Sequence, residues 1–241
     1  MPNSSGDIPN GSRPGAVFGD LRPYAYQTGK VEFFYLPFRS DERALVPRLE
    51  TESLVREVLA QTKSGEFAHV VDVGTGSGII AVSVAKNRPE LSVTALDLSD
   101  DALSLARENA RSNGAEIEFV RSDLLRSLPE TVGDSGNVFF VANLPYVREG
   151  AGDMSPDTAY EPAMALYGGS GTGFELTARF LREVEDFRLR HPDVGIAVAC
   201  EVGDDHEEEI RKIASELGRD IRIFADLSGI RRFFTYRVWP S

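Results

Sequence analysis

The stretch VVDVGTGSGII, residues 70–80, decides the fold of this chain. A short β-branched run leads into three glycines, Gly74, Gly76 and Gly78, and an apolar helical pattern follows. Glycines between a strand and a helix permit a tight turn and let a ligand approach the backbone beside the positive helix end. Their spacing is GxGxG, because position 79 is isoleucine, and this excludes the GxGxxG dinucleotide fingerprint. No Lys-Ser or Lys-Thr pair follows, which also excludes a phosphate-binding P-loop.

Strands and helices alternate from this loop to the C-terminus. We expect strands over residues 69–73, 92–98, 116–120, 137–143, 194–200, 221–226 and 232–238. Ser99 is expected to cap one of the helices between them, and Asp204 with Glu207 to form a capping box for another. A short turn joins the last two strands, so they must be antiparallel. The pattern predicts an α/β fold with a mostly parallel seven-stranded sheet, an antiparallel last strand and helices on both faces.

The N-terminal part does not follow this alternation. Residues 1–30 are predicted to be a flexible lead, since the first fifteen are rich in Pro, Gly, Ser and Asn. Residues 31–38 and 43–47 predict a hairpin, and a helix is expected from Glu50. We therefore expect a hairpin and a helix over 31–68, followed by the main domain over 69–241.

Composition excludes several classes of protein. The 241 residues carry 26 basic and 38 acidic side chains, a net charge of −12, which argues against a protein that neutralises many phosphates of nucleic acid. Cys200 is the only cysteine and the three histidines lie far apart, so no disulfide and no metal site are expected. No apolar run suits a membrane span and the N-terminus lacks a signal-peptide core. We expect a cytoplasmic protein without a membrane partner.

An acid follows the glycine loop at an informative distance. Asp97 ends the next strand, 19 residues after the last glycine, where an acid is placed to bind ribose hydroxyls. This arrangement resembles the S-adenosylmethionine site of Rossmann-like class I methyltransferases. The resemblance implies that Asp72 and the loop hold the methionine end, Asp97 the ribose and Asp123 the adenine amino group of S-adenosyl-L-methionine, with S-adenosyl-L-homocysteine as the product. The cofactor-binding residues expected on this resemblance are Asp72, Gly74, Thr75, Gly76, Gly78, Asp97, Leu98, Asp123, Leu124 and Asn143.

The segment NLPY, residues 143–146, ends the fourth predicted strand and resembles the (N/D)PPY motif of methyltransferases that modify planar NH₂ groups. The nitrogen of an amide is a poor nucleophile because its lone pair is delocalised. Acceptors fixed on its two N–H bonds can orient it and favour charge development during attack. We expect the side-chain oxygen of Asn143 and the carbonyl of Pro145 to be these acceptors, with Tyr146 stacked on the planar group.

Three further segments indicate which family of methyltransferases the chain resembles. LVPRLETESLV (45–55), EPAMALYGGSGTG (161–173) and the C-terminal pattern ending in DLSGIRRF resemble segments of the HemK/PrmC glutamine methyltransferases, over roughly residues 30–238. The resemblance implies N5-methylation of the glutamine in the GGQ loop of peptide chain release factors, which would be the protein partner. The resemblance also implies that the acceptor pocket and its mouth are formed by Asn143, Leu144, Pro145, Tyr146, Glu161 and Pro162. It further implies that the segment that closes over the cofactor contains Arg48, Glu50 and Thr51.

The chain departs from that family in three places. NLPY replaces NPPY and also resembles the motif of ribosomal RNA adenine dimethyltransferases, Leu49 replaces a proline, and residues 1–44 lack the pattern of the family's N-terminal helical domain. Two other hypotheses therefore stand beside a glutamine methyltransferase: an N6-adenine methyltransferase acting on RNA or DNA, and a non-catalytic binding module. The charge of −12 favours the protein acceptor over a nucleic acid. The presence of the loop, the acid and NLPY together argues against the binding module.

Overall fold

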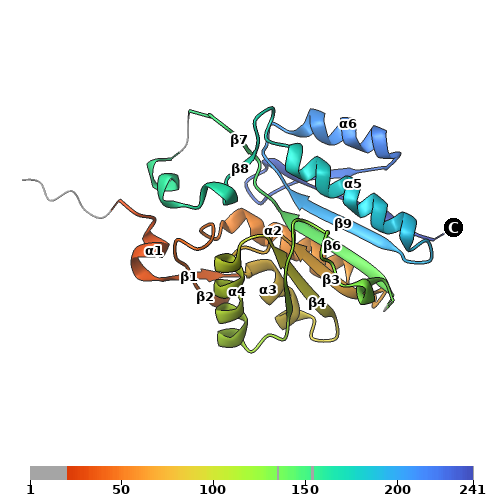
Figure 1. Ribbon diagram of the computed structural model, residues 1–241, viewed down its shortest axis with the longest axis horizontal. Coiled ribbons are helices and arrows are strands. Elements are labelled where there is room, and N and C mark those ends of the chain that lie inside the picture. Colours follow the sequence, from red (N-terminus) through yellow and green to blue (C-terminus); the bar gives the residue numbers. More distant parts are fainter. Residues whose placement is uncertain (1–20, 135, 153–154, 241) are drawn as a thin grey trace, which may run out of the picture.

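The computed structural model describes residues 21–134, 136–152 and 155–240. A seven-stranded sheet runs through it (Figure 1). The strands are, in spatial order, β10 (Arg222–Ala225), β11 (Arg231–Val238), β9 (Ile196–Glu201), β6 (Asn137–Asn143), β3 (Phe67–Val73), β4 (Ser92–Asp97) and β5 (Glu118–Arg121). Only β11 runs antiparallel to its neighbours, because β10 and β9 both pair with it in that sense. The predicted fold class, including the antiparallel last strand, is confirmed.

Helices cover both faces of the sheet, as Figure 1 shows. One face packs against α5 (Glu175–Arg190) and α6 (Glu207–Leu217). The other face packs against α2 (Glu52–Gln61), α3 (Ile79–Asn87) and α4 (Asp100–Asn113). Strand β3 serves both cores through alternate residues, with Val70 in one cluster and Val71 in the other. Burial on both faces explains the nearly continuous apolar run of this strand.

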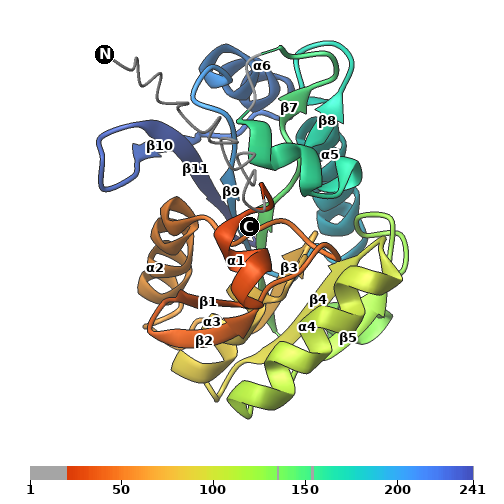
Figure 2. The same ribbon diagram turned by 90° about the vertical axis from the view of Figure 1, so that its left-hand side faces the viewer.

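The N-terminal hairpin lies beside α4 and belongs to the same core (Figure 2). Strands β1 (Lys30–Phe33) and β2 (Leu36–Arg39) pair antiparallel, and the short helix α1 (Tyr24–Thr28) precedes them within the part expected to be flexible. Residues 1–20 of the expected lead lie outside the described residues. Phe33 and Phe38 are almost fully buried against the α2 and α3 side of the sheet.

The expected position of the hairpin was wrong. Both strands fall on the run 31–38 predicted as one strand and extend it by one residue at each end, and residues 43–47 form no strand. The chain turns at Phe34 and Tyr35, which have φ values of 49° and 62°. Such a turn normally carries Asn or Gly, but here the Phe34 N–H donates to Glu52 Oε1 of α2 at 3.0 Å. A tertiary contact therefore supports a turn that has no sequence signature.

The two predicted helix caps have different outcomes. The Ser99 hydroxyl accepts a hydrogen bond from the Ala102 N–H at 3.2 Å, which confirms the cap of α4. The predicted capping box at Asp204 is wrong, because α6 begins at Glu207 and its preceding residue, His206, makes no side-chain cap. His206 instead lies buried beside Phe174.

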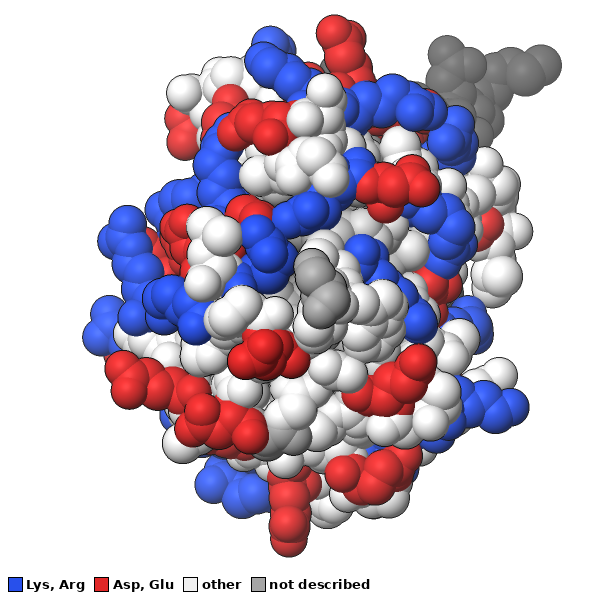
Figure 3. All heavy atoms as spheres, turned by 90° about the vertical axis from the view of Figure 1, so that its right-hand side faces the viewer, with Lys and Arg blue, Asp and Glu red and all other residues white. Residues whose placement is uncertain are grey.

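The remaining elements form the connections around the sheet. Strands β7 (Val147–Arg148) and β8 (Tyr167–Gly169) make a small parallel pair, and four 3₁₀ turns occur, η1 (Leu49–Thr51), η2 (Glu130–Gly133), η3 (Pro156–Tyr160) and η4 (Ala163–Ala165). Basic and acidic side chains are interspersed on the face turned away from the hairpin (Figure 3).

Candidate active site

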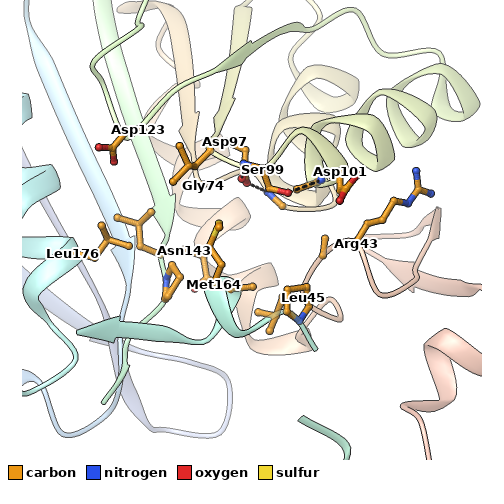
Figure 4. A pocket seen from close by; sticks show the side chains of 18 of the residues that line it. Arg43, Leu45, Gly74, Asp97, Ser99, Asp101, Asp123, Asn143, Met164 and Leu176 are labelled. Atoms are coloured by element: carbon orange, nitrogen blue, oxygen red, sulfur yellow. Dashed lines mark hydrogen bonds between the residues drawn. The ribbon is translucent and has the colours of Figure 1, made fainter. Parts of the chain in front are cut away.

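A cavity of about 270 Å³ lies at the carboxyl ends of the central parallel strands (Figure 4). Strand order reverses between β3 and β6, and a crevice forms at such a switch point in doubly wound sheets. The cavity brings together residues from the N-terminal segment, the strand ends and the segment after NLPY. Those predicted from the sequence are Gly74, Gly76, Asp97, Leu98, Asp123, Leu124, Asn143, Leu144, Pro145 and Pro162. Residues lining it that were not predicted to belong to the site include Arg43, Leu45, Ser99, Asp101, Met164 and Leu176.

Asp97 holds the glycine loop and the start of α4 together. Its Oδ2 accepts a hydrogen bond from the Gly76 N–H at 2.9 Å, and its Oδ1 accepts one from the Ser99 N–H at 2.9 Å. Burial raises the pKa of Asp97, while the backbone donors act in the opposite direction. Carboxylate oxygens can accept more than one hydrogen bond each, so Asp97 can bind hydroxyl groups in the cavity as well.

Asp72 lies behind the loop, away from the residues that line the cavity. It is fully buried, and its Oδ2 accepts hydrogen bonds from the Thr75 hydroxyl at 2.6 Å and the Ala81 N–H at 3.1 Å. Its Oδ1 has no hydrogen-bond partner, and burial raises the pKa of Asp72 to about 7. In this arrangement Asp72 and Thr75 brace the loop from inside.

Gly78 also lies outside the cavity lining. Its φ of 83° and its contact with α4 both require glycine, since a Cβ there would lie 3.0 Å from the Cβ of Ala106. This glycine permits the close approach of α3 and α4.

Asp123 lines the cavity but is paired with two arginines. Its Oδ1 contacts Arg179 of α5, and its Oδ2 lies 3.1 Å from Arg126 Nη1. The next residue, Leu124, is buried and has a positive φ of 52°. The carboxylate expected to meet an adenine amino group thus also anchors α5 to the end of β5.

The NLPY segment is held by hydrogen bonds and by close backbone contacts. Asn143 Nδ2 donates to the Thr51 hydroxyl at 3.1 Å, and that hydroxyl donates to Glu201 Oε2 at 2.7 Å. Burial raises the pKa of Glu201 to about 7. A Cβ added to Gly168 would lie 2.2 Å from the Pro145 carbonyl oxygen, so β8 can pass this carbonyl only with glycine there.

Tyr146, the last residue of NLPY, is not among the residues that line the cavity. Its ring meets the His206 ring edge-on with centroids 6.5 Å apart. Burial raises the pKa of Tyr146 to about 12, so it stays a neutral phenol at physiological pH.

At the mouth of the cavity, Glu161 of the segment after NLPY contacts Val46 and Arg48 of the N-terminal segment. Its buried carboxylate contacts Arg48 Nη2 at 2.6 Å and accepts the Val46 N–H at 3.0 Å. Pro162 follows Glu161 and Leu45 precedes Val46, and both line the cavity. The expected mouth residue Glu161 therefore acts here as a clamp between residues 46–48 and 161.

Sequence reasoning did not identify Glu201 or the contact between Thr51 and Asn143. Thr51 was expected on the cofactor side, whereas its hydroxyl contacts Asn143. The only signal for Glu201 was an acid at the end of an apolar strand, in the segment already noted for its C-terminal pattern. Glu50 does not line the cavity.

Among the described residues we find neither a membrane-spanning helix nor a metal-binding group. None of their helices combines the length and apolarity needed to cross a bilayer. No group of three or more His, Cys, Asp or Glu side chains among them is placed to hold a metal ion.

The fold and the strand-end site are those of a Rossmann-like methyltransferase domain. Residues 50–153 match the family model "Methyltransferase small domain". The chain is 33% identical over 213 residues to the release factor glutamine methyltransferase of Streptococcus pneumoniae, covering 88% of this chain and 73% of that protein. The chain belongs to the release factor glutamine methyltransferase family.

Three other comparisons concern a second protein acceptor and the fold. The ribosomal protein uL3 glutamine methyltransferase of Xylella fastidiosa is 36% identical over 192 residues, 78% of this chain and 59% of that protein. The catalytic domain of human METTL16 was solved in complex with an RNA hairpin, and its TM-score is 0.65 at 14% identity, covering 84% of this chain and 76% of that chain. Its N-terminal domain in complex with SAH has a TM-score of 0.57 at 16% identity, with the same coverage. At these identities the likeness to METTL16 shows the fold alone.

Proposed function

We propose that this protein methylates N5 of a glutamine side chain, and that the acceptor is the GGQ glutamine of a peptide chain release factor. The observation that carries the proposal is that the glycine loop and NLPY line one cavity and touch each other. A Cβ at Gly74 would lie 2.8 Å from Leu144 Cδ2, so the glycine loop that would hold a methyl donor packs directly on the Leu144 side chain of the segment that would hold an amide. The family relationship supports the same acceptor chemistry.

The residues at the cavity fit S-adenosyl-L-methionine. A Cβ at Gly76 would meet no atom within 4 Å, so the loop backbone borders open space there. Asp97 offers carboxylate oxygens at the strand end where ribose hydroxyls are expected. Leu98 and Leu124 add apolar surface to the same lining. When bound, S-adenosyl-L-methionine supplies the methyl group that the amide nitrogen receives, and S-adenosyl-L-homocysteine remains.

The chain's own residues orient the amide. Asn143 Oδ1 and the Pro145 carbonyl accept the two N–H groups of the glutamine amide, which fixes the plane of that amide. Acceptors in these positions also stabilise positive charge as it develops on the nitrogen during attack. No general base is needed before the attack, because the proton can leave after the methyl group has arrived. The expected stacking of Tyr146 on the planar group stays a prediction, since its ring contacts His206 and it does not line the cavity.

Domain organisation and location follow from the same proposal. Residues 69–241 supply the methyltransferase domain, and the segment 31–68 contributes Leu45 to the cavity lining and Thr51 as a hydrogen-bond partner of Asn143. The cytoplasm, expected from the single cysteine, is the compartment in which we place the activity.

Methyl transfer from labelled S-adenosyl-L-methionine to three acceptors tests the proposal. The acceptors are a purified release factor, ribosomal protein uL3 and an RNA hairpin. We expect label on the release factor, located by peptide mass spectrometry at the GGQ glutamine, and none on a release factor whose glutamine is replaced by alanine. Transfer to uL3 alone would change the acceptor but keep the reaction, whereas transfer to the RNA alone would overturn the proposal.

A further inference from the structure

Three segments that lie far apart in the sequence meet at Asn143. Thr51 belongs to η1 before helix α2, Asn143 ends β6, and Glu201 ends the neighbouring strand β9. Parallel pairing of these strands sets Asn143 directly beside Glu201. The Thr51 hydroxyl bridges the two side chains, at 3.1 Å from Asn143 Nδ2 and 2.7 Å from Glu201 Oε2. Thr51 and Glu201 are almost fully buried, which shields both hydrogen bonds from water.

The direction of these hydrogen bonds determines which end of the Asn143 amide faces Thr51. A hydroxyl has a single hydrogen, and the hydrogen of Thr51 is donated to Glu201. With Glu201 ionised, and therefore only an acceptor, the hydroxyl of Thr51 can only accept toward Asn143, so the NH₂ end of the amide faces it. The oxygen Oδ1 then occupies the other end, and no described residue donates a hydrogen bond to it.

We propose that Glu201 and Thr51 are positioning residues that lock the Asn143 amide with its oxygen available to the substrate. This inference rests on the proposed function, because it explains how Asn143 presents an acceptor rather than a donor to a substrate NH₂ group. A flipped Asn143 would present its own N–H groups to the substrate N–H groups, and the two sets of donors would repel. Thr51 and Glu201 act through Asn143 and need not touch the substrate.

Replacing Thr51 by a residue of the same shape without a hydroxyl tests this chain of hydrogen bonds from Glu201 through Thr51 to Asn143, which we call the relay. Thr51→Val deletes the hydroxyl, and Thr51→Ser restores it. Thr62→Val is the matched control, since Thr62 is an equally buried threonine at the other end of α2 whose hydroxyl donates to the Val58 carbonyl. Each variant is measured for kcat and KM with the release factor and for affinity toward S-adenosyl-L-homocysteine by calorimetry.

We expect Thr51→Val to lower kcat by roughly tenfold, the effect of losing one orienting hydrogen bond. The affinity for S-adenosyl-L-homocysteine should stay within about twofold, because the relay does not contact the glycine loop. Thr51→Ser should recover most of kcat, and Thr62→Val should keep it. The inference is overturned if Thr51→Val keeps its kcat, or if Thr62→Val loses as much.

A readout that needs no activity separates the relay from the proposed function. In protein labelled with ¹⁵N-asparagine, one Asn143 side-chain N–H should exchange slowly with solvent, and Thr51→Val should remove this protection. If the wild-type protein leaves glutamine unmethylated, the proposed function fails and the exchange measurement alone judges the relay. Equal exchange in the wild type and in Thr51→Val would overturn it.

Discussion

Replacing Glu161 by glutamine and Arg48 by methionine removes the ion pair that joins the two sides of the cavity mouth. The Glu161 side chain is fully buried, with one oxygen 2.6 Å from Arg48 Nη2 and the other bonded to the Val46 N–H. The Arg48 side chain is 34% exposed. The pair is therefore intermediate between a surface ion pair and a buried one.

The size of the coupling follows from that position. Exposed pairs contribute about 0–1 kcal/mol, and removal of one partner from a buried pair costs roughly 3–5 kcal/mol. With one partner buried and the other partly solvated, we expect a coupling free energy of about 2 kcal/mol. Glu161→Gln alone should cost more than Arg48→Met alone, because it also weakens the acceptor for the Val46 N–H.

A double-mutant cycle measures this coupling. The free energy of unfolding is determined by urea denaturation for the wild type, both single variants and the double variant. The matched control is the cycle for Arg182 and Glu216, a pair with two contacts of 2.9 and 3.1 Å whose side chains are about half exposed. We expect about 0.5 kcal/mol for that control.

The same variants report on the cavity. Leu45 and Pro162, next to Val46 and Glu161 in the sequence, line it, so each single substitution should weaken the binding of S-adenosyl-L-homocysteine. A coupling no larger than that of the Arg182 and Glu216 control, together with unchanged binding, would refute the clamp.

Three further substitutions test the loop, the NLPY backbone and the buried acid. Asp97→Asn should weaken S-adenosyl-L-homocysteine binding by about tenfold or more through loss of a charged acceptor. Unaltered binding in calorimetry would show that Asp97 does not bind the ribose. Gly168→Ala should lower kcat and cost about 1–3 kcal/mol of stability, because its Cβ would lie 2.2 Å from the Pro145 oxygen. Gly152→Ala is its control, since a Cβ there meets nothing within 4 Å, and equal effects would contradict the contact. Asp72 has a folded-state pKa of about 7 against 3.8 for a free carboxyl, so the native state keeps a proton that the unfolded state loses. The free energy of unfolding should then fall by up to about 1.4 kcal/mol per pH unit as the pH rises between these values, and an Asp72→Asn variant that kept the wild-type slope would exclude this origin.

The sheet was predictable because its pattern depends on local sequence. Strand β6 was placed at residues 137–143, as observed, since its apolar run is bounded by asparagines on both sides. The Ser99 cap was predictable for the same reason, as the hydroxyl and its partner are three residues apart. The hairpin turn at Phe34 and Tyr35 was not, because it depends on Glu52, which is 18 residues further along the chain.

The strand pattern predicted the cavity where its residues end parallel strands, whereas Pro162 was predicted from the family resemblance. Gly74, Asp97 and Asn143 converge because the carboxyl ends of such strands meet at one edge of the sheet. The contact between Thr51 and Glu201 joins residues 150 apart in the sequence. The register between β6 and β9 sets Glu201 beside Asn143. No local pattern encodes that register, so the partners of Asn143 emerged only from the folded chain. The roles assigned to these residues stay predictions.

The leucine of NLPY has a structural explanation that bears on the acceptor. Leu144 is buried against Gly74, so the second position of the motif packs against the glycine loop. The polar groups expected to contact an amide belong to the residues on either side, Asn143 and Pro145. Pro145 still restricts the backbone of the residue before it, as a proline would in any such motif. Exchange of proline for leucine at position 144 therefore alters the packing between two loops and leaves the amide acceptors in place. We expect the choice of acceptor protein to depend on the cavity mouth around Glu161 rather than on Leu144.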